Sequence, residues 1–356
     1  MTIEFLRVLN GDSILIRFTD KDNNKRNILI DGGPTNSYTY SDRRTKRPCA
    51  GDLKLRLEEI KKQQEKIDLL VVTHIDDDHI GGILKWMEDA SFSKENIGKI
   101  WFNSGQLIFD FFKEPLPPEN LILLKRNLDL NTSIPQGVTF EKYILELDIW
   151  DRKIIKSQDE FHEFGITFKI LSPEIKNLKP LLTKWEKEQK DTFTSKKNDY
   201  DISLKEHLEQ DVFIEDNSKH NGSSIAFILT YEGKNFVFLA DAHPSIIING
   251  LRYFGYCENN KLKAKLIKVS HHGSKANTNE ELLDLIDCEH FIISSNGEHH
   301  ALPNKQCLAR IIAKKTNTVL YFNYYSELIE EEKFFSKQDC IDFPNFKTLD
   351  KNKFDF

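Results

Sequence analysis

Short apolar runs separated by polar turns organise the first part of the chain. Ile3 to Val8, Ser13 to Phe18 and Asn27 to Ile30 each have the length and apolar content of a strand. Turn-forming residues separate them, at Asn10-Gly11-Asp12 and at Asp22-Asn23-Asn24. The pattern therefore predicts two or three antiparallel strands joined by tight turns.

Helical and strand-like patterns alternate in the next segment. Apolar residues recur at helical spacing from about Asp52 to Lys66, and Ile67 to Val72 is a mostly apolar run of strand length. A second helix is expected from Gly81 to Glu88, and another strand from Ile97 to Asn103. This alternation predicts an α/β arrangement in which buried strands lead into polar loops.

The middle of the chain is different in composition. From about Phe109 to His220 it is rich in Lys and Glu, with helical patterns at Leu181 to Lys190 and Ile202 to Glu209. One strand is expected inside it, from Ile166 to Leu171. We therefore expect a single domain over 1–356, made of an N-terminal half (1–173), a charged helical insertion or linker (174–216) and a C-terminal half (217–356).

Strands ending in polar residues return after position 216. The expected strands are Ser224 to Tyr231, Phe236 to Ala240, Ala264 to Val269 and Phe291 to Ser294. The second is followed at once by Asp241, and the third by Ser270-His271-His272-Gly273-Ser274. Potential metal ligands therefore stand at the ends of strands that are far apart in the sequence.

Composition narrows the class of protein. Of 356 residues, 39% are hydrophobic and 30% charged, which is typical of a chain that builds a core. No apolar run approaches the roughly 18 residues that a membrane span needs, and Glu4 and Arg7 interrupt the place of a signal peptide's apolar stretch. The five cysteines are scattered and form no CxxC pair, which argues against a disulfide framework or a structural zinc site. We expect a cytoplasmic protein without membrane association.

The charge balance bears on possible partners. The net charge of −6 does not indicate a broad basic surface for long duplex nucleic acid. A local basic loop nevertheless lies at Arg43, Arg44, Lys46 and Arg47. It is either a solvated loop or an element that steers an anionic substrate.

The densest chemical signal is His74-Ile75-Asp76-Asp77-Asp78-His79, which follows a buried strand. Carboxylates that converge repel one another and are costly to desolvate unless a cation neutralises them. The cluster offers more side chains than one ion would coordinate, and two ions about 3.5–4 Å apart would account for them. A solvated acidic loop is the alternative, but Asp241 and the His271-His272 turn make it less favoured. The pattern predicts a two-metal site that activates water as a nucleophile.

These residues carry a resemblance to the metallo-β-lactamase superfamily. THIDDDHIGG (Thr73 to Gly82) resembles its signature H-x-H-x-D-H-x-G-G, with Asp76 in place of the second histidine. Further matching segments are NGDSILI, ILIDGG, NGSSIAFIL, VFLADAHPS and KVSHHGSKANT. The set most resembles the metal domain of ComEC-type competence proteins, over about residues 1–105 and 220–315. The resemblance implies a four-layered αβ/βα sandwich, with two mixed sheets flanked by helices.

The resemblance also implies a ligand set for two divalent ions, Zn²⁺ or Mn²⁺. The first site would use His74, Asp76 and a bridging Asp241, and the second Asp78, His79, Asp241 and His271. Because carboxylates outnumber those of a zinc lactamase site, manganese competes with zinc. The usual third histidine of the first site has no secure counterpart. His220 lies near its place but is more simply a surface histidine, and His272 and Asp31 are possible additional site residues.

Roles in the reaction follow from the same resemblance. Asp78 and Asp241 would position a metal-bound hydroxide, and His300, three residues before Pro303, would donate a proton or bind phosphate. Asn221, Ser223 and Ser274 are weak candidates for holding phosphate oxygens. Turn-forming roles are at least as favoured for Asn221 and Ser223.

The function expected from these features is hydrolysis of a phosphodiester, with DNA or RNA as the leading substrate. The alternatives are a carbonyl hydrolase acting on an ester, lactone or lactam, and a partner-regulated defence-type effector acting on nucleotides. The charged middle segment would be the place where such a protein partner binds. A non-catalytic module is disfavoured because all the expected ligands are present.

Overall fold

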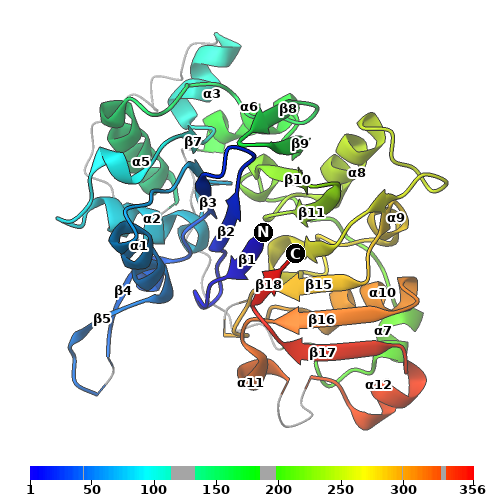
Figure 1. Ribbon diagram of the computed structural model, residues 1–356. Coiled ribbons are helices and arrows are strands. Elements are labelled where there is room, and N and C mark those ends of the chain that lie inside the picture. The colour runs from blue at the N-terminus through cyan, green and yellow to red at the C-terminus, as the bar shows by residue number, and fades with distance from the viewer. Residues whose placement is uncertain (43, 114–132, 185–197, 299, 330–333) are drawn as a thin grey trace. The chain divides into compact units, whose positions relative to one another are not determined.

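The computed structural model describes residues 1–42, 44–113, 133–184, 198–298, 300–329 and 334–356. The chain divides into two compact units, each with its own sheet and core (Figure 1). Unit 1 comprises Met1–Ile155, Glu174–Asp191 and Lys353–Phe356, and unit 2 comprises Lys156–Pro173 and Thr192–Asn352.

The main sheet of unit 1 has the strand order β18-β1-β2-β3-β6-β7. Its strands are β1 (Thr2–Phe5), β2 (Ile14–Thr19), β3 (Lys25–Ile30), β6 (Leu69–Val71), β7 (Ile100–Trp101) and β18 (Lys353–Asp355). The pairs from β18 to β3 are antiparallel, whereas β3, β6 and β7 run parallel. Because β3 and β6 are parallel, the residues that follow both strands lie at one edge of the sheet.

Helices of unit 1 supply most of its core. They are α1 (Asp52–Lys62), α2 (Asp77–Met87), α3 (Gly105–Phe112), α5 (Ser133–Leu147) and α6 (Ile175–Lys184), with short 3₁₀ turns η1 (Thr35–Ser37) and η2 (Lys94–Asn96). Leu53 of α1 and Ile83 of α2 are fully buried with Leu70 of β6. A hairpin, β4 (Thr39–Ser41) with β5 (Pro48–Ala50), extends away from the sheet and carries the basic loop (Figure 1).

Unit 2 holds a larger mixed sheet with the order β17-β16-β15-β13-β11-β10-β9-β8. Its strands are β8 (Glu160–Glu163), β9 (Ile166–Ser172), β10 (Ala226–Tyr231), β11 (Lys234–Phe238), β13 (Leu266–Lys268), β15 (His290–Ile293), β16 (Thr318–Phe322) and β17 (Phe346–Asp350). Strands β11 to β17 are parallel and β8 to β11 antiparallel. The ends of the parallel strands β11 and β13 therefore lie next to each other.

The helices of unit 2 complete its apolar core. They are α7 (Leu204–Glu209), α8 (Pro244–Tyr253), α9 (Glu280–Asp284), α10 (Lys305–Lys314), α11 (Tyr325–Leu328) and α12 (Lys337–Asp342), with 3₁₀ turns η3 (Asn221–Ser223) and η4 (Ser270–Gly273). A two-stranded sheet joins β12 (Leu262–Lys263) to β14 (Ile286–Asp287). Val237, Ile247 and Leu308 belong to this core and are at most 1% exposed.

The predicted α/β class with mixed sheets flanked by helices is confirmed, and most predicted strands are present within two or three residues of their expected bounds. Helix α1 ends at Lys62 rather than at Lys66, and α2 begins at Asp77 rather than at Gly81. The helical pattern at 181–190 is seen as far as Lys184, beyond which it lies outside the described residues.

The two units do not follow the sequence division at residues 173 and 216. Residues 156–173 group with unit 2, because β8 pairs with β9 and β9 pairs with β10. Conversely, α6 belongs to unit 1, where it contacts α3. The described part of the supposed insertion from residue 198 onward belongs to unit 2, where buried polar contacts hold it. Within the described ranges, no helix is long and apolar enough to cross a bilayer.

Candidate metal centre

In unit 1 the candidate ligands follow β6 directly. Thr73 and His74 come after the strand, and Asp76 is the N-cap of α2 with an extended backbone. Asp78 and His79 lie in the first helical turn, where the positive end of the helix dipole favours carboxylates. The helical backbone of this turn sets the directions in which the Asp78 and His79 side chains point.

Asp31, directly after β3, organises this part of unit 1. It is fully buried, and its left-handed backbone (φ 56°) suits Asp better than most residues. Its carboxylate accepts hydrogen bonds from the Thr73 amide (2.8 Å) and the Thr73 hydroxyl (2.7 Å). It also accepts one from Nδ1 of His79 (2.8 Å). Asp31 thus links the end of β6 to the first turn of α2.

These hydrogen bonds fix the tautomers of both histidines. A carboxylate only accepts, so in neutral His79 the hydrogen lies on Nδ1 and the lone pair on Nε2. The Thr73 hydroxyl gives its single hydrogen to Asp31, so at 3.0 Å it accepts one from Nδ1 of His74. Both imidazoles therefore present Nε2, the nitrogen that a metal would take.

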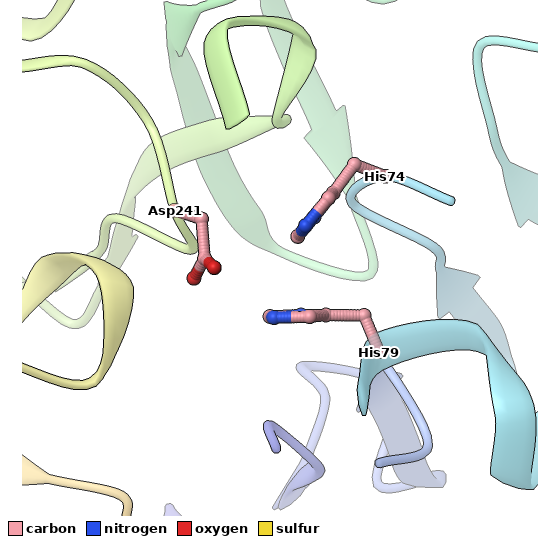
Figure 2. Close-up of side chains that lie close together, drawn as sticks. All are labelled: His74, His79 and Asp241. Atoms are coloured by element: carbon pink, nitrogen blue, oxygen red, sulfur yellow. The ribbon is translucent and has the colours of Figure 1, made fainter. Parts of the chain in front are cut away.

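The acceptor atoms of unit 1 gather closely. The His74 and His79 rings lie 4.1 Å apart between centroids, and Figure 2 shows their nitrogen-bearing ends pointing the same way. Nε2 of His74 is 3.6 Å from a carboxylate oxygen of Asp76. Nε2 of His79 is 4.0 Å from a carboxylate oxygen of Asp78. Both histidine side chains are buried, whereas the two carboxylates are about one-quarter exposed, at 28% and 26%.

Close backbone packing explains the glycines of the motifs. A Cβ on Gly11 would lie 2.0 Å from the carbonyl oxygen of Asp78, and the amide of Asp12 donates to that same oxygen (3.1 Å). A Cβ on Gly82 would lie 2.1 Å from the carbonyl oxygen of Gly32. Only glycine permits these approaches. The segments that carry Gly11, Gly32 and Gly82 therefore pack closely against one another at the start of α2.

Two other acidic residues of unit 1 have distinct positions. Asp77 accepts a hydrogen bond from Gln136 of α5 (2.6 Å), and burial raises the pKa of its carboxyl. Asp77 thus takes part in the packing of α2 against α5. The buried Asp12 has a carboxylate oxygen within 4.8 Å of ligand atoms of Asp31 and His79.

Unit 2 contributes Asp241, His271 and His272. Asp241, labelled in Figure 2, is buried on the loop after β11, and both histidines follow β13 in left-handed conformations (φ 46° and 52°). Nε2 of His271 and Nε2 of His272 each lie 3.7 Å from Oδ2 of Asp241. The two histidines are therefore equally placed toward this carboxylate, and the expected preference for His271 has no counterpart in these distances.

The surroundings of Asp241 are strongly charged. Lys268 is buried, donates to the Ala240 carbonyl (3.3 Å) and places Nζ 4.0 Å from Oδ1 of Asp241. Burial lowers the pKa of His271, but Asp241 and a second carboxylate outweigh burial and leave that pKa raised. That second carboxylate belongs to Asp216, which sequence reasoning missed together with Asn277.

The remaining predicted residues have structural contacts. His220 is buried (5% exposed) rather than on the surface, and the Ser223 hydroxyl donates to its carbonyl (2.6 Å). Asn221 donates to Asp216 (2.6 Å), and the Ser274 hydroxyl accepts from the Ala276 amide (3.3 Å). His300 is exposed, and the neighbouring loop is tied to η4 by a bond from the Asn304 amide to the Gly273 carbonyl (3.0 Å).

The donor chemistry of each unit fits divalent metal ions. In unit 1, two Nε2 lone pairs face two carboxylates, and in unit 2 the Asp241 carboxylate is faced by two imidazole Nε2 atoms. Groups that only accept are normally brought together by a cation or a proton. Imidazole with carboxylate suits zinc, and the carboxylate share also suits manganese.

One family model matches part of the chain. Residues 6–155 match the family model described as Metallo-beta-lactamase superfamily. No curated protein matches this chain.

Solved structures that align with this chain include a mutant of the CmlA beta-hydroxylase, aligned over 99% of this chain at 10% identity with a TM-score of 0.38. The alignment covers 53% of the CmlA chain, so this chain spans about half its length. Zn²⁺-bound PqqB from Methylobacterium extorquens aligns over 100% of both chains at 9% identity (TM-score 0.43). A protein of unknown function from Enterococcus faecalis aligns over 93% of this chain and 67% of its own at 13% identity (TM-score 0.33). The region that matches the superfamily model, residues 6–155, contains Asp31 and the His74–His79 cluster.

Proposed function

We propose that the chain is a metal-dependent phosphodiesterase of the ComEC-like kind, with nucleic acid as its substrate. The observation that carries the proposal is the pair of buried imidazoles, His74 and His79. Both are fixed with Nε2 beside a carboxylate by hydrogen bonds through Thr73 and Asp31. Such oriented acceptors are a costly arrangement unless they hold cations.

In this proposal the predicted ligands bind two divalent ions. The ligands are His74, Asp76, Asp78, His79, Asp241 and His271, with His272 as a further candidate. Ions bound there would lower the pKa of a coordinated water and neutralise charge on the phosphoryl oxygens.

The chain's own groups supply the remaining functions. Asp31 keeps His79 in the tautomer that binds metal, and the Thr73 hydroxyl does the same for His74. Asp78 and Asp241 are proposed to orient the attacking water through their carboxylates. The exposed His300 is proposed to protonate the leaving oxygen.

Two features favour a phosphodiester over a carbonyl substrate. The donor set is rich in carboxylates, which suits the hard ions common in two-metal phosphoryl transfer. The β4–β5 hairpin also exposes Arg44, Lys46 and Arg47, here called the hairpin cations, while Arg43 lies outside the described residues. Asp42, the only acid of this hairpin, accepts hydrogen bonds within the turn from the Arg44 amide (3.1 Å) and the Thr45 amide (2.6 Å). The hairpin therefore presents net positive charge to solvent, as an anionic polymer requires.

A substrate panel tests the proposal. Metal-depleted protein is given Mn²⁺, Zn²⁺ or Mg²⁺ and assayed on single-stranded DNA, duplex DNA, RNA, bis-p-nitrophenyl phosphate and carbonyl substrates (an ester, a lactone and a lactam). We expect diester cleavage that His79→Ala abolishes and that His162→Ala, at an exposed position of β8, leaves intact. Turnover of carbonyl substrates alone would overturn the phosphodiesterase assignment.

A further inference from the structure

A segment of the charged middle region is fastened to unit 2 along its length. Asp199 caps α10 by accepting from the amides of Lys305 (2.8 Å) and Gln306 (3.2 Å). Further along, Asp211 pairs with the buried Arg310 through two hydrogen bonds, of 2.7 and 2.6 Å. These contacts fix the path of the chain toward Asp216.

Asp216 ends this path beside the loop of unit 2 that carries His271. Its amide donates to the Ala276 carbonyl (3.1 Å), and its side chain is 13% exposed. Its Oδ1 accepts from the Ser218 amide (2.9 Å), and its Oδ2 accepts from Asn221 (2.6 Å) and Asn277 (3.1 Å). Asp216 is therefore a hydrogen-bond acceptor at a fixed place.

Asn277 connects Asp216 to two candidate ligands. It is fully buried, and its Nδ2 contacts both Asp216 Oδ2 (3.1 Å) and the Asp241 carbonyl oxygen (3.1 Å). Both of those oxygens only accept hydrogen bonds, so this end of the amide must be the NH₂ group. The other end, Oδ1, lies 3.0 Å from Nδ1 of His271 and accepts its hydrogen.

The chain of hydrogen bonds thus determines the tautomer of His271. With its hydrogen on Nδ1, neutral His271 keeps the lone pair on Nε2, the atom 3.7 Å from Asp241 Oδ2. If Asp216 offered no acceptor, the Asn277 amide would lose one of the three oxygens that hold its orientation, the others being the carbonyls of Asp241 (3.1 Å) and Ala242 (3.5 Å). A flipped amide would turn a donor toward Nδ1 and favour the opposite tautomer, in which Nε2 carries a hydrogen and binds no metal.

We propose that Asp216 and Asn277 are a positioning pair that holds His271 ready to bind metal, so that the middle segment is part of the metal-binding apparatus. The inference rests on the proposed function for the identity of what His271 binds. His272 has a simpler support, because its Nδ1 donates to the Ser294 carbonyl (2.9 Å) of the polypeptide backbone. The two adjacent histidines therefore differ in what fixes them, and only His271 depends on Asp216.

The test compares Asp216→Ala with Glu215→Ala. Both changes remove one negative charge at neighbouring positions of the segment, but Glu215 binds the Ser245 amide (2.8 Å) and hydroxyl (3.0 Å) and has no bond to Asn277. Two quantities are measured: the His271 tautomer by nitrogen NMR of the metal-free, full-length protein, and the affinity for Mn²⁺ and Zn²⁺ by competition with a chelating dye.

In the wild type and in Glu215→Ala we expect neutral His271 to carry its hydrogen on Nδ1. In Asp216→Ala, which removes the acceptor of Asn277, we expect a mixture of tautomers and an affinity about 10–100-fold lower. Asp216→Glu, which keeps the carboxylate, is expected to recover part of the loss. Asp216→Ala with wild-type tautomer and affinity would overturn the proposal.

The wild-type spectrum alone is also decisive, since a hydrogen on Nε2 of His271 would contradict the inference even if Asp216→Ala fails to fold. Failure of the proposed function is seen separately. In that case the wild type binds neither ion, while the NMR measurement still tests the positioning pair.

Discussion

Replacing Asp31 by Asn is the perturbation whose effect is most fully set by the structure. The carboxylate accepts three hydrogen bonds from Thr73 and His79, and Asn keeps its shape while converting one oxygen to a donor. Asn also tolerates the left-handed backbone at this position, whereas Ala would add about 1–2 kcal/mol of strain. Asp31→Asn therefore tests the hydrogen bonds and leaves the backbone out of the comparison.

The expected magnitude follows from the number of bonds lost. Placing the amide oxygen at Oδ2 keeps the bonds from the Thr73 hydroxyl and His79, but turns the amide nitrogen toward the Thr73 amide. One hydrogen bond to a charged group is then lost and a buried N–H is left without an acceptor, at a cost of about 2–3 kcal/mol. The remaining bonds lose their charge, so we also expect metal affinity to fall about 10–100-fold.

The assay separates these two effects. Unfolding by urea is followed in chelator by the fluorescence of Trp86 and Trp101, which are both buried in unit 1, and metal affinity is measured by dye competition. The control is Asp68→Asn. That carboxylate is also buried but accepts from Arg26 (2.9 Å) and the Asn27 amide (2.9 Å). The Asp68→Asn variant should lower the free energy of unfolding and leave the metal affinity unchanged. An Asp31→Asn protein with wild-type metal affinity would refute the orienting role.

Three further outcomes follow from the structure. Gly11→Ala places a Cβ 2.0 Å from the Asp78 carbonyl oxygen and should cost about 3 kcal/mol in urea unfolding as well as weaken metal binding. Gly233→Ala, with nothing within 4 Å of the added Cβ, should cost only about 1–2 kcal/mol. The hydrogen bond with Arg310 lowers the pKa of Asp211 below its ordinary 3.8. The stabilisation of the folded state by this pair is therefore present above that pH and is lost as pH falls through the lowered pKa. The stability difference between wild type and Asp211→Asn should accordingly be full at pH 6 and shrink below about pH 4, and a constant difference would contradict this. Reversing the charge of the three hairpin cations should weaken binding of a single-stranded oligonucleotide to metal-free protein and reduce the salt slope by up to about 2, with hydrolysis of a small diester unchanged. An unchanged slope, measured by fluorescence anisotropy, would exclude the hairpin from binding.

Local patterns were sufficient for most of the sheet strands and for the clustering of ligands in unit 1. His74 and Asp78 are close in sequence and follow a buried apolar run, so their proximity needs no knowledge of the rest of the chain. The start of α2 was misplaced because Asp76-Asp77-Asp78 was interpreted as a loop. Acidic residues are in fact favoured at an N-cap and in a first helical turn, so the signal was present in the sequence.

The features that the sequence did not predict depend on contacts between segments far apart in the chain. Asp216 lies in a charged stretch that has the composition of a solvated linker, and only the packing of Asn277 against it shows its role. Asp211 is similar, because its partner Arg310 is 99 positions away in the chain. The grouping of β8 and β9 with unit 2 likewise follows from strand pairing with β10, which a local pattern does not encode.

The most direct test of the central claim is a metal titration in which bound ions and diester hydrolysis are followed together. Mn²⁺ is added to metal-depleted protein, bound metal is determined by equilibrium dialysis, and the rate of bis-p-nitrophenyl phosphate hydrolysis is recorded at each point. We predict that the rate rises to a plateau as two ions per chain are bound, and that His79→Ala shows neither the plateau nor the second ion. A wild-type protein that binds no ion, or that hydrolyses the diester at the same rate without one, would contradict the account.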